Sequence, residues 1–272
     1  MEYRIGDALI HFVAHGEGVP LVALHGAGVD HREIEAAVED ALRIGEGASS
    51  QSRGLQRIYP DLPGMGLSTA DGLNGNADVV TALCSFLDHL DAGPVLLLGH
   101  SYGAYLARGV AARRPDAVRG LALVCPAAET SRNVPRHEAV RRDADAYDEL
   151  EPAHRAGFDE YFVVRTRATA RRYRDAAVPG QTLVDEVALG RLFARWTLEL
   201  DSHDFAAPTL ILAGRRDSIV GHVDATALLT SYPHATLAVV DDAGHALMHE
   251  RPALFAALLD DWFVRASVQP GR

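Results

Sequence analysis

The sequence is poor in the features that define several large protein classes. Only two of its 272 residues are cysteines, Cys84 and Cys125, too few for the disulfide framework of a small secreted protein. A reducing compartment such as the cytoplasm is the simpler interpretation. No apolar run reaches membrane-spanning length, and the polar start, Met1-Glu2-Tyr3-Arg4, does not resemble a signal peptide. We therefore expect a cytoplasmic protein without a membrane partner.

Positive charge is also scarce: the acidic residues outnumber the basic ones, and the formal net charge is -11. Such a chain repels phosphate backbones, which argues against nucleic acid as a partner. There is no P-loop lysine pattern, and residues 26–31 place His31 where a dinucleotide-binding fingerprint needs a small residue. His245 and His249 are four residues apart but lack the glutamate of the H-E-x-x-H zinc motif.

What the chain does contain is an alternation of short apolar runs with amphipathic helical patterns. Strands that alternate with helices predict an α/β fold, with a mostly parallel central sheet flanked by helices on both faces. Between residues 126 and 205 the pattern is helical without a clear strand. We expect a core domain, 1–125 and 206–272, and a helical cap or lid, 126–205, at the carboxyl edge of the sheet, where ligands bind. Residues 3–14 predict an edge hairpin, and the buried-strand candidates are 20–24, 95–98, 118–125, 208–214 and 235–240.

Ser101 lies in the pattern Gly99-His100-Ser101-Tyr102-Gly103, between an apolar run and a helical pattern. In the order strand, G-x-S-x-G, helix, the serine occupies a sharp turn and its hydroxyl is exposed. Gly99 and Gly103 lack side chains, so strand and helix can approach closely around a residue that needs an unusual backbone angle. The pattern predicts a nucleophilic serine at position 101.

A serine hydroxyl needs a base that takes its proton and a third group that orients the base. After a nucleophile on such a turn, the acid comes next in the chain and the histidine last. Asp217 follows the predicted strand 208–214, and His245 follows the strand 235–240. Both loops then lie at the sheet edge that holds Ser101, so we expect a Ser101–His245–Asp217 triad.

Acyl transfer also needs hydrogen-bond donors for the negative oxygen of its intermediate. One is expected to be the backbone N–H of Tyr102, directly after the nucleophile. The other is expected from the loop His25-Gly26-Ala27-Gly28, which follows an apolar run and whose glycines let the backbone of Ala27 come close to a substrate. Ala27 and Tyr102 are the predicted oxyanion hole, with Gly26 and Gly28 beside the substrate.

The chain resembles the α/β-hydrolase superfamily, in particular its lidded small-molecule hydrolases. The segments that carry the resemblance span nearly the whole chain outside the insertion: Leu24–Gly28, Asp61–Ser68, Gly99–Gly103, Gly214–Asp217 and Gly244–His245. The resemblance implies a Ser–His–Asp triad, no metal and no cofactor. In some relatives the acid follows an earlier strand, where this chain has Glu129, so Glu129 stays open as an alternative to Asp217.

Departures from the family pattern narrow the reaction. Haloalkane dehalogenases and epoxide hydrolases of this fold use an aspartate nucleophile, which Ser101 excludes. Hydrolases of carbon–carbon bonds often have tryptophan after the catalytic histidine. This chain has Ala246 at that position, which weakens the interpretation that it cleaves a carbon–carbon bond. A run of arginines in the insertion could supply a partner for a substrate carboxylate, although a solvated helix face is the simpler interpretation. These arginines are Arg165, Arg167, Arg171, Arg172 and Arg174.

The sequence therefore predicts a serine hydrolase that cleaves an ester, thioester or lactone of a small molecule through an acyl-enzyme. Two other hypotheses stay open: a carbon–carbon bond hydrolase or lyase on the same triad, and a non-catalytic ligand-binding protein. The intact triad counts against the last, since a receptor has no need of all three groups. We expect Tyr102, Met65 and Met248 to line an apolar substrate pocket, and the protein to be a monomer or homodimer.

Overall fold

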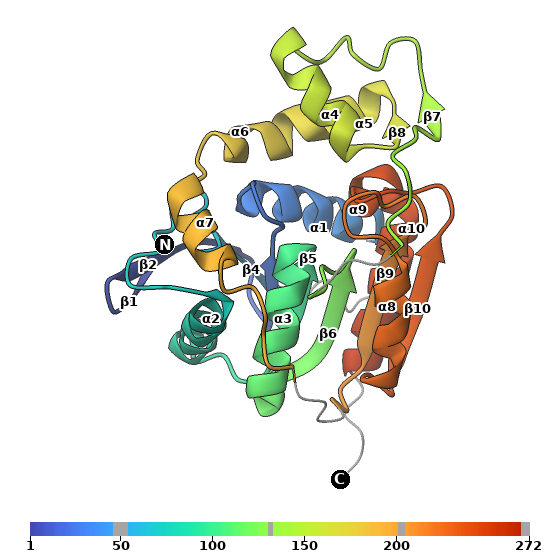
Figure 1. Cartoon of the computed structure of the whole chain (residues 1–272). Helices are drawn as coiled ribbons and strands as arrows, with labels where there is room; N and C mark the ends of the chain where they lie inside the picture. Colours follow the sequence, from blue (N-terminus) through green and yellow to red (C-terminus); the bar gives the residue numbers. More distant parts are fainter. Residues whose placement is uncertain (46–53, 130–132, 201–204, 268–272) are drawn as a thin grey trace.

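The computed structural model describes residues 1–45, 54–129, 133–200 and 205–267. Its centre is an eight-stranded sheet in the order β1-β2-β4-β3-β5-β6-β9-β10 (Figure 1). Strand β2 pairs antiparallel with both β1 and β4, and all pairs from β4 to β10 are parallel. The strands are β1 (Glu2–Ile5), β2 (Ala8–His15), β3 (Val19–Leu24), β4 (Leu55–Pro60), β5 (Val95–His100), β6 (Val118–Val124), β9 (Thr209–Gly214) and β10 (Ala235–Val240).

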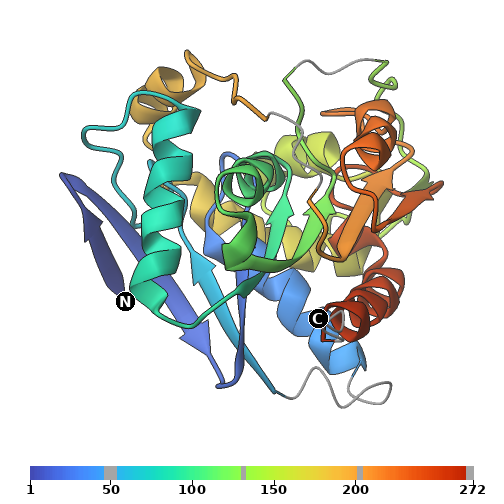
Figure 2. The ribbon, with the colours of Figure 1, turned by 90° about the horizontal axis from the view of Figure 1, so that it is seen from below.

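Helices cover both faces of the sheet, as the alternating sequence pattern predicts. Figure 2 shows α1 (His31–Gly45) and α10 (Pro252–Ser267) packed together on one face, and α2 (Asn76–Leu90) and α3 (Tyr102–Arg113) on the other. The central strands β5 and β9 are buried along their whole length. A parallel strand with both faces covered needs this continuous apolar run rather than an alternating one.

A helical insertion, which we call the cap, lies between β6 and β9 and covers the carboxyl edge of the sheet (Figure 1). It has its own small core, in which Phe158 and Phe162 pack against Tyr173. The sequence predicted no strand here, and the structure has two paired two-residue strands, too short to leave a pattern. The cap contains β7 (Arg141–Arg142), η3 (Pro152–His154), α4 (Arg155–Tyr161), β8 (Val164–Arg165), α5 (Arg167–Arg172), the π-helix η4 (Tyr173–Ala177), α6 (Val178–Gln181) and α7 (Glu186–Phe193).

The shorter elements outside the cap lie in connections of the core. They are η2 (Pro115–Ala117), α8 (Val223–Ala227), η5 (Leu228–Thr230) and α9 (Leu247–Glu250). Among the described residues, no helix has the length and apolar character that crossing a membrane requires.

Candidate active site

Ser101 sits on a strained turn between β5 and α3. Its φ of 54° lies in the region that non-glycine residues rarely adopt. A Cβ on Gly99 would lie 2.4 Å from the carbonyl oxygen of Gly103, and one on Gly103 would lie 2.4 Å from that of His25. The two glycines are therefore needed for the close approach of strand and helix. The Ser101 N–H donates to the carbonyl of Val124 on β6 at 2.9 Å, which ties the turn to the sheet.

Asp217 and His245 are hydrogen-bonded partners at the same sheet edge. The Nδ1 atom of His245 lies 2.8 Å from Oδ2 of Asp217, and both side chains are buried. The other carboxylate oxygen, Oδ1, accepts the backbone N–H groups of Ile219 at 2.9 Å and Val220 at 3.0 Å. The acid that contacts His245 is thus Asp217, whereas Glu129 is exposed.

Asp217 stays ionised despite its burial. Burial opposes the charged form, but His245 and the N–H groups of Val220 and Ile219 outweigh it and lower the pKa of Asp217 below its usual value. A carboxylate can only accept, so His245 donates its Nδ1–H to it. The tautomer that results leaves Nε2 of His245 free to act as a base.

The loop after β3 presents backbone N–H groups beside Ser101. His25 fixes this loop: its Nδ1 lies 2.7 Å from the carbonyl of Gly26, and its Nε2 accepts the N–H of Leu62 at 2.9 Å. Burial lowers the pKa of His25, which favours the neutral ring that this pattern requires. The Gly28 N–H is engaged by the Met65 sulfur at 3.3 Å.

Within the described ranges, neither the N–H group of Ala27 nor that of Tyr102, both near Ser101, has a hydrogen-bond acceptor. They belong to the loop after β3 and to the first residue of α3, the two places from which an oxyanion hole is built in this arrangement. Ala27 is exposed, so a ligand can reach its backbone.

A pocket of about 340 Å³ joins these groups, with Ser101, His245, Gly26, Ala27 and Gly28 in its wall. In the part of the chain that the structure describes, no hydrogen bond joins the Ser101 hydroxyl to His245. Catalytic hydrogen bonds of this kind are often long without substrate and tighten when it binds. The remaining lining residues come from β5, the loop after Asp217, the end of the loop 25–29 and the cap: His100, Ile219, Val29, Gly157, Glu160, Tyr161, Ala177 and Gln181.

The apolar side chains expected in this pocket lie elsewhere. Met65 and Met248 are fully buried and are not among its lining residues, and neither is Tyr102. The Tyr102 ring stacks with Trp196, 5.6 Å between centroids, and its hydroxyl donates to Asn76 at 2.8 Å. The sequence could not show this, because a side chain next to a nucleophile can point into the core as readily as into the pocket.

The arginines of the cap bind carboxylates of the protein. Arg167, Arg171 and Arg174 all donate to Glu149 at 2.6 to 2.8 Å. Arg172 forms an ion pair with Asp40 on α1, and the buried Arg165 bonds to Asp159 and to nearby backbone. None of the five lines the pocket.

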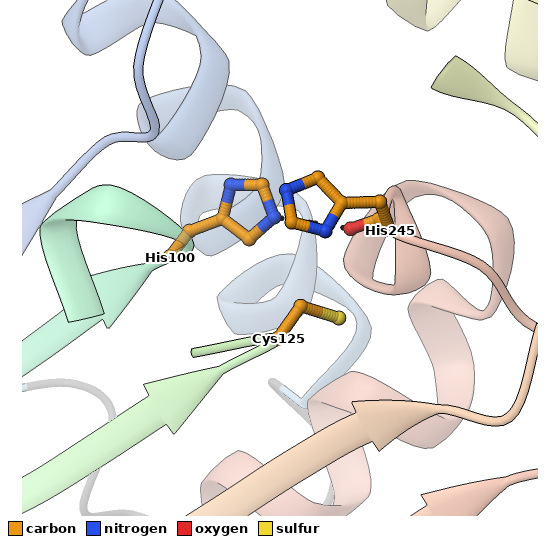
Figure 3. A group of neighbouring side chains, drawn as sticks. All are labelled: His100, Cys125 and His245. Carbon is orange, nitrogen blue, oxygen red and sulfur yellow. Dashed lines mark hydrogen bonds between the residues drawn. The ribbon is translucent and has the colours of Figure 1, made fainter. Parts of the chain in front are cut away.

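Two clusters in the described residues have metal-ligand side chains close together. In the first, donor atoms of His100, Cys125 and His245 lie within 4.8 Å of one another (Figure 3). Here His100 Nε2 bonds to the carbonyl of His245 at 3.0 Å, and burial raises the pKa of the Cys125 thiol well above its usual value. A protonated thiol is a poor metal ligand. The set therefore fits a packed hydrogen-bonded cluster better than a metal site.

The second cluster, His11, His31 and Asp61, lies at the start of α1. Both histidines bond through Nδ1 to Asp61, at 3.0 and 2.7 Å, and the backbone N–H groups of His31 and Leu67 bond to the same carboxylate. All four bonds stabilise the turn after β4, so the cluster has a structural explanation.

Glu250 joins the loop that carries His245 to the cap. Its Oε2 accepts the N–H of Gly244, directly before His245, at 2.6 Å. Its Oε1 accepts the N–H groups of Val163 at 2.7 Å and Val164 at 3.0 Å, at the start of β8. Burial raises the pKa of Glu250 to about 7, although the three N–H groups favour the charged form.

This pKa gives stability a defined pH dependence. The pKa of Glu250 is higher in the folded protein than the usual value of about 4.3. At pH values between these two pKa values, the folded state therefore binds more protons than the unfolded state. The free energy of unfolding should fall as pH rises from about 4.5 to about 7, by about 2–3 kcal/mol from this group. In denaturant unfolding measured across this pH range, Glu250→Gln should remove this dependence of the unfolding free energy on pH. Glu186→Gln, an exposed control on α7, should retain it. Equal pH dependence in both variants would contradict the assignment of this dependence to Glu250.

Comparison with known proteins agrees with the fold. The chain is 28% identical to a 2-hydroxymuconate semialdehyde hydrolase of Pseudomonas putida, over 92% of this chain and 89% of that protein. It is 28% identical to haloalkane dehalogenase 2 of Mycobacterium tuberculosis, over 93% of this chain and 91% of that protein. An alpha/beta superfamily hydrolase from Oenococcus oeni PSU-1 has a similar structure, with TM-score 0.85 and 23% identity, covering 98% of this chain and 100% of the other. The model of the alpha/beta hydrolase family matches residues 21–258, so the chain belongs to that family.

Proposed function

We propose that the protein is a serine hydrolase that cleaves a small-molecule ester, thioester or lactone. The observation that carries the proposal is the 2.8 Å bond between His245 and Asp217 at the pocket that Ser101 also lines. The N–H groups of Ala27 and Tyr102, which have no acceptor in the described residues, support it, because acyl transfer needs donors of this kind for its developing oxyanion.

Each group then has one role. Ser101 attacks the carbonyl carbon, and its proton passes to Nε2 of His245, whose imidazolium Asp217 stabilises. The N–H groups of Ala27 and Tyr102 bind the oxyanion. The intermediate collapses as His245 protonates the leaving group, which departs and leaves the acyl-Ser101 ester. A water molecule, deprotonated by His245, hydrolyses that ester and releases the acid.

The pocket favours an acyl group without negative charge. The sequence has no lysine, so all 26 of its Lys+Arg residues are arginines. Of the described residues that line the pocket none is an arginine, and Glu160 adds a carboxylate at the exposed cap side. A substrate carboxylate there would meet a like charge, and the His100 ring in the pocket wall is already paired with the buried carboxylate of Glu33.

The second candidate, cleavage of a carbon–carbon bond, draws on the name of the Pseudomonas putida relative. Its named substrate, 2-hydroxymuconate semialdehyde, carries a carboxylate. The lining of this pocket, with Glu160 and without arginine, supports the ester assignment over that one. Activity on a vinylogous diketone with none on simple esters would reverse the preference.

Two esters of equal length separate the candidates directly. We expect kcat/KM for p-nitrophenyl butyrate to exceed that for mono-p-nitrophenyl succinate by about fivefold, since a like charge near the surface is worth about 1 kcal/mol. Glu160→Gln should lower the ratio of the two kcat/KM values, because it removes the carboxylate that repels the succinate ester. Preference for the succinate ester would contradict the assignment of a neutral acyl group, and no turnover of any ester in a panel graded by acyl length would contradict the esterase itself.

A further inference from the structure

A second set of buried polar groups lies beside the triad and has no part in the steps above. Its centre is Glu33, a carboxylate on the buried face of α1 with no exposed surface. Its Oε1 accepts the hydroxyl of Tyr161 at 2.8 Å and lies 3.3 Å from Nε2 of His249 and 3.4 Å from Nδ1 of His100. Groups from α1, β5, α9 and the cap thus converge on one oxygen atom.

The centre of this set is an ion pair. Burial opposes ionisation of Glu33, but His100 and His249 outweigh it and hold the pKa of Glu33 well below its usual range. Burial also opposes the charged form of His100, yet Glu33 raises the pKa of that ring. A buried carboxylate without such partners is strongly destabilising, so the Glu33 carboxylate and the His100 ring hold each other in place.

His100 connects Glu33 to the loop that carries His245. Its Nε2 lies 3.0 Å from the backbone carbonyl oxygen of His245, the bond drawn dashed in Figure 3. Nε2 must be the donor, since a carbonyl only accepts, and Nδ1 faces the Glu33 carboxylate. The hydrogen bond at Nε2 and the ion-pair contact at Nδ1 together favour one orientation of the His100 ring. It packs against the ring of His245, with 4.9 Å between centroids.

Tyr161 brings the cap to the same carboxylate. It is the last residue of α4 and lines the pocket, and its ring lies at 68° to the ring of His245, with 5.9 Å between centroids. Its hydroxyl donates to the Glu33 carboxylate. A hydrogen bond thus fixes the cap to the core, from a tyrosine whose ring contacts that of His245.

We propose that Glu33 is a positioning residue for the reaction: it orients His100 on the carbonyl of His245 and receives the Tyr161 hydroxyl, so that one group sets both the alignment of the catalytic ring and the closure of the cap. The inference rests on the proposed function, because it needs Ser101 and His245 to react. Glu33 acts through these neighbours and does not contact the substrate.

The test is a double-mutant cycle in kcat for a neutral ester. Glu33→Gln keeps the shape but removes the charge, and should lower kcat about tenfold with KM within about twofold. Tyr161→Phe removes the cap bond alone and should lower kcat about threefold. If the hydroxyl acts through the carboxylate, the double variant is no slower than Glu33→Gln alone. Matched controls are Glu35→Gln, whose carboxylate bonds to His15, and Tyr147→Phe, whose hydroxyl bonds to Asp159; both should leave kcat within twofold.

The rate at which a fluorophosphonate labels Ser101 distinguishes a failure of the positioning role of Glu33 from a failure of the proposed serine hydrolase. The expected result is labelling of the wild type, with about tenfold slower labelling of Glu33→Gln at a temperature where both are folded. Equal labelling rates and equal kcat would overturn the positioning role and leave the serine hydrolase intact. Additive losses in the double variant would overturn the shared role of the carboxylate. A wild-type protein that does not label would overturn the proposed function, and the positioning role with it.

Discussion

Ser101→Ala should lower kcat for a neutral ester by about 10⁵-fold and abolish labelling by a fluorophosphonate. The loss is this large because the other groups of the site act on an oxygen that the variant lacks. His245 would keep its bond to Asp217, and the N–H groups of Ala27 and Tyr102 would still face the pocket, but there would be no nucleophile to activate. Residual turnover would come from the oxyanion donors and substrate binding alone.

Ser101→Gly is the control for folding. The φ of 54° at Ser101 costs a non-glycine residue about 1–3 kcal/mol, and glycine adopts such angles freely. This variant should therefore be inactive and at least as stable as the wild type in thermal unfolding. Full activity in either variant would show that the serine is not the nucleophile. Tight ligand binding by the wild type without turnover, unchanged in Ser101→Ala, would instead favour a non-catalytic binding protein.

The positions that could be predicted from the sequence are those that follow from the backbone. Ser101, Asp217 and His245 each lie within five residues of the end of a strand, and a parallel sheet brings such strand ends to one edge. The loop after β3, with Ala27, follows from the same geometry. Local sequence was enough because glycines and strand ends fix where these groups lie.

Side-chain directions could not be derived in the same way. Met65, Met248 and Tyr102 are close in sequence to the active-site loops, yet all three are buried away from the pocket. The cap residues that do line it, such as Tyr161 and Gln181, lie in no motif. Their place depends on how the cap packs on the core, and no short pattern encodes that packing.

Glu33 is an intermediate case, because a signal was present in the sequence. The buried face of α1 repeats at helical spacing through Ala37 and Ala41, and Glu33 falls on that same face one turn earlier. A charged residue at a core position requires a buried partner. The sequence could have flagged the residue, but the partners, His100 on β5 and His249 on α9, only become neighbours in the folded chain.

Asp217→Asn should lower kcat by about 10⁴-fold near neutral pH with little change in the fold. The reason lies in how the two carboxylate oxygens are used. Oδ1 accepts the N–H groups of Ile219 and Val220, so an asparagine would keep its carbonyl oxygen on that side. Its NH₂ group would then face Nδ1 of His245 and donate to it. The ring would be held with its proton on Nε2, and in that tautomer it cannot accept the proton of Ser101.

Glu129→Gln is the matched control, because it removes a carboxylate after an earlier strand that is exposed in this structure. We expect it to leave kcat within about twofold of the wild type. The pair of variants decides which acid serves the triad, measured as kcat on the same neutral ester at one pH. If Asp217→Asn stayed active while Glu129→Gln lost activity, the 2.8 Å bond to His245 would be a packing contact and the catalytic acid would lie after β6. The two backbone donors on Asp217, which hold its charge beside the ring, favour the opposite outcome.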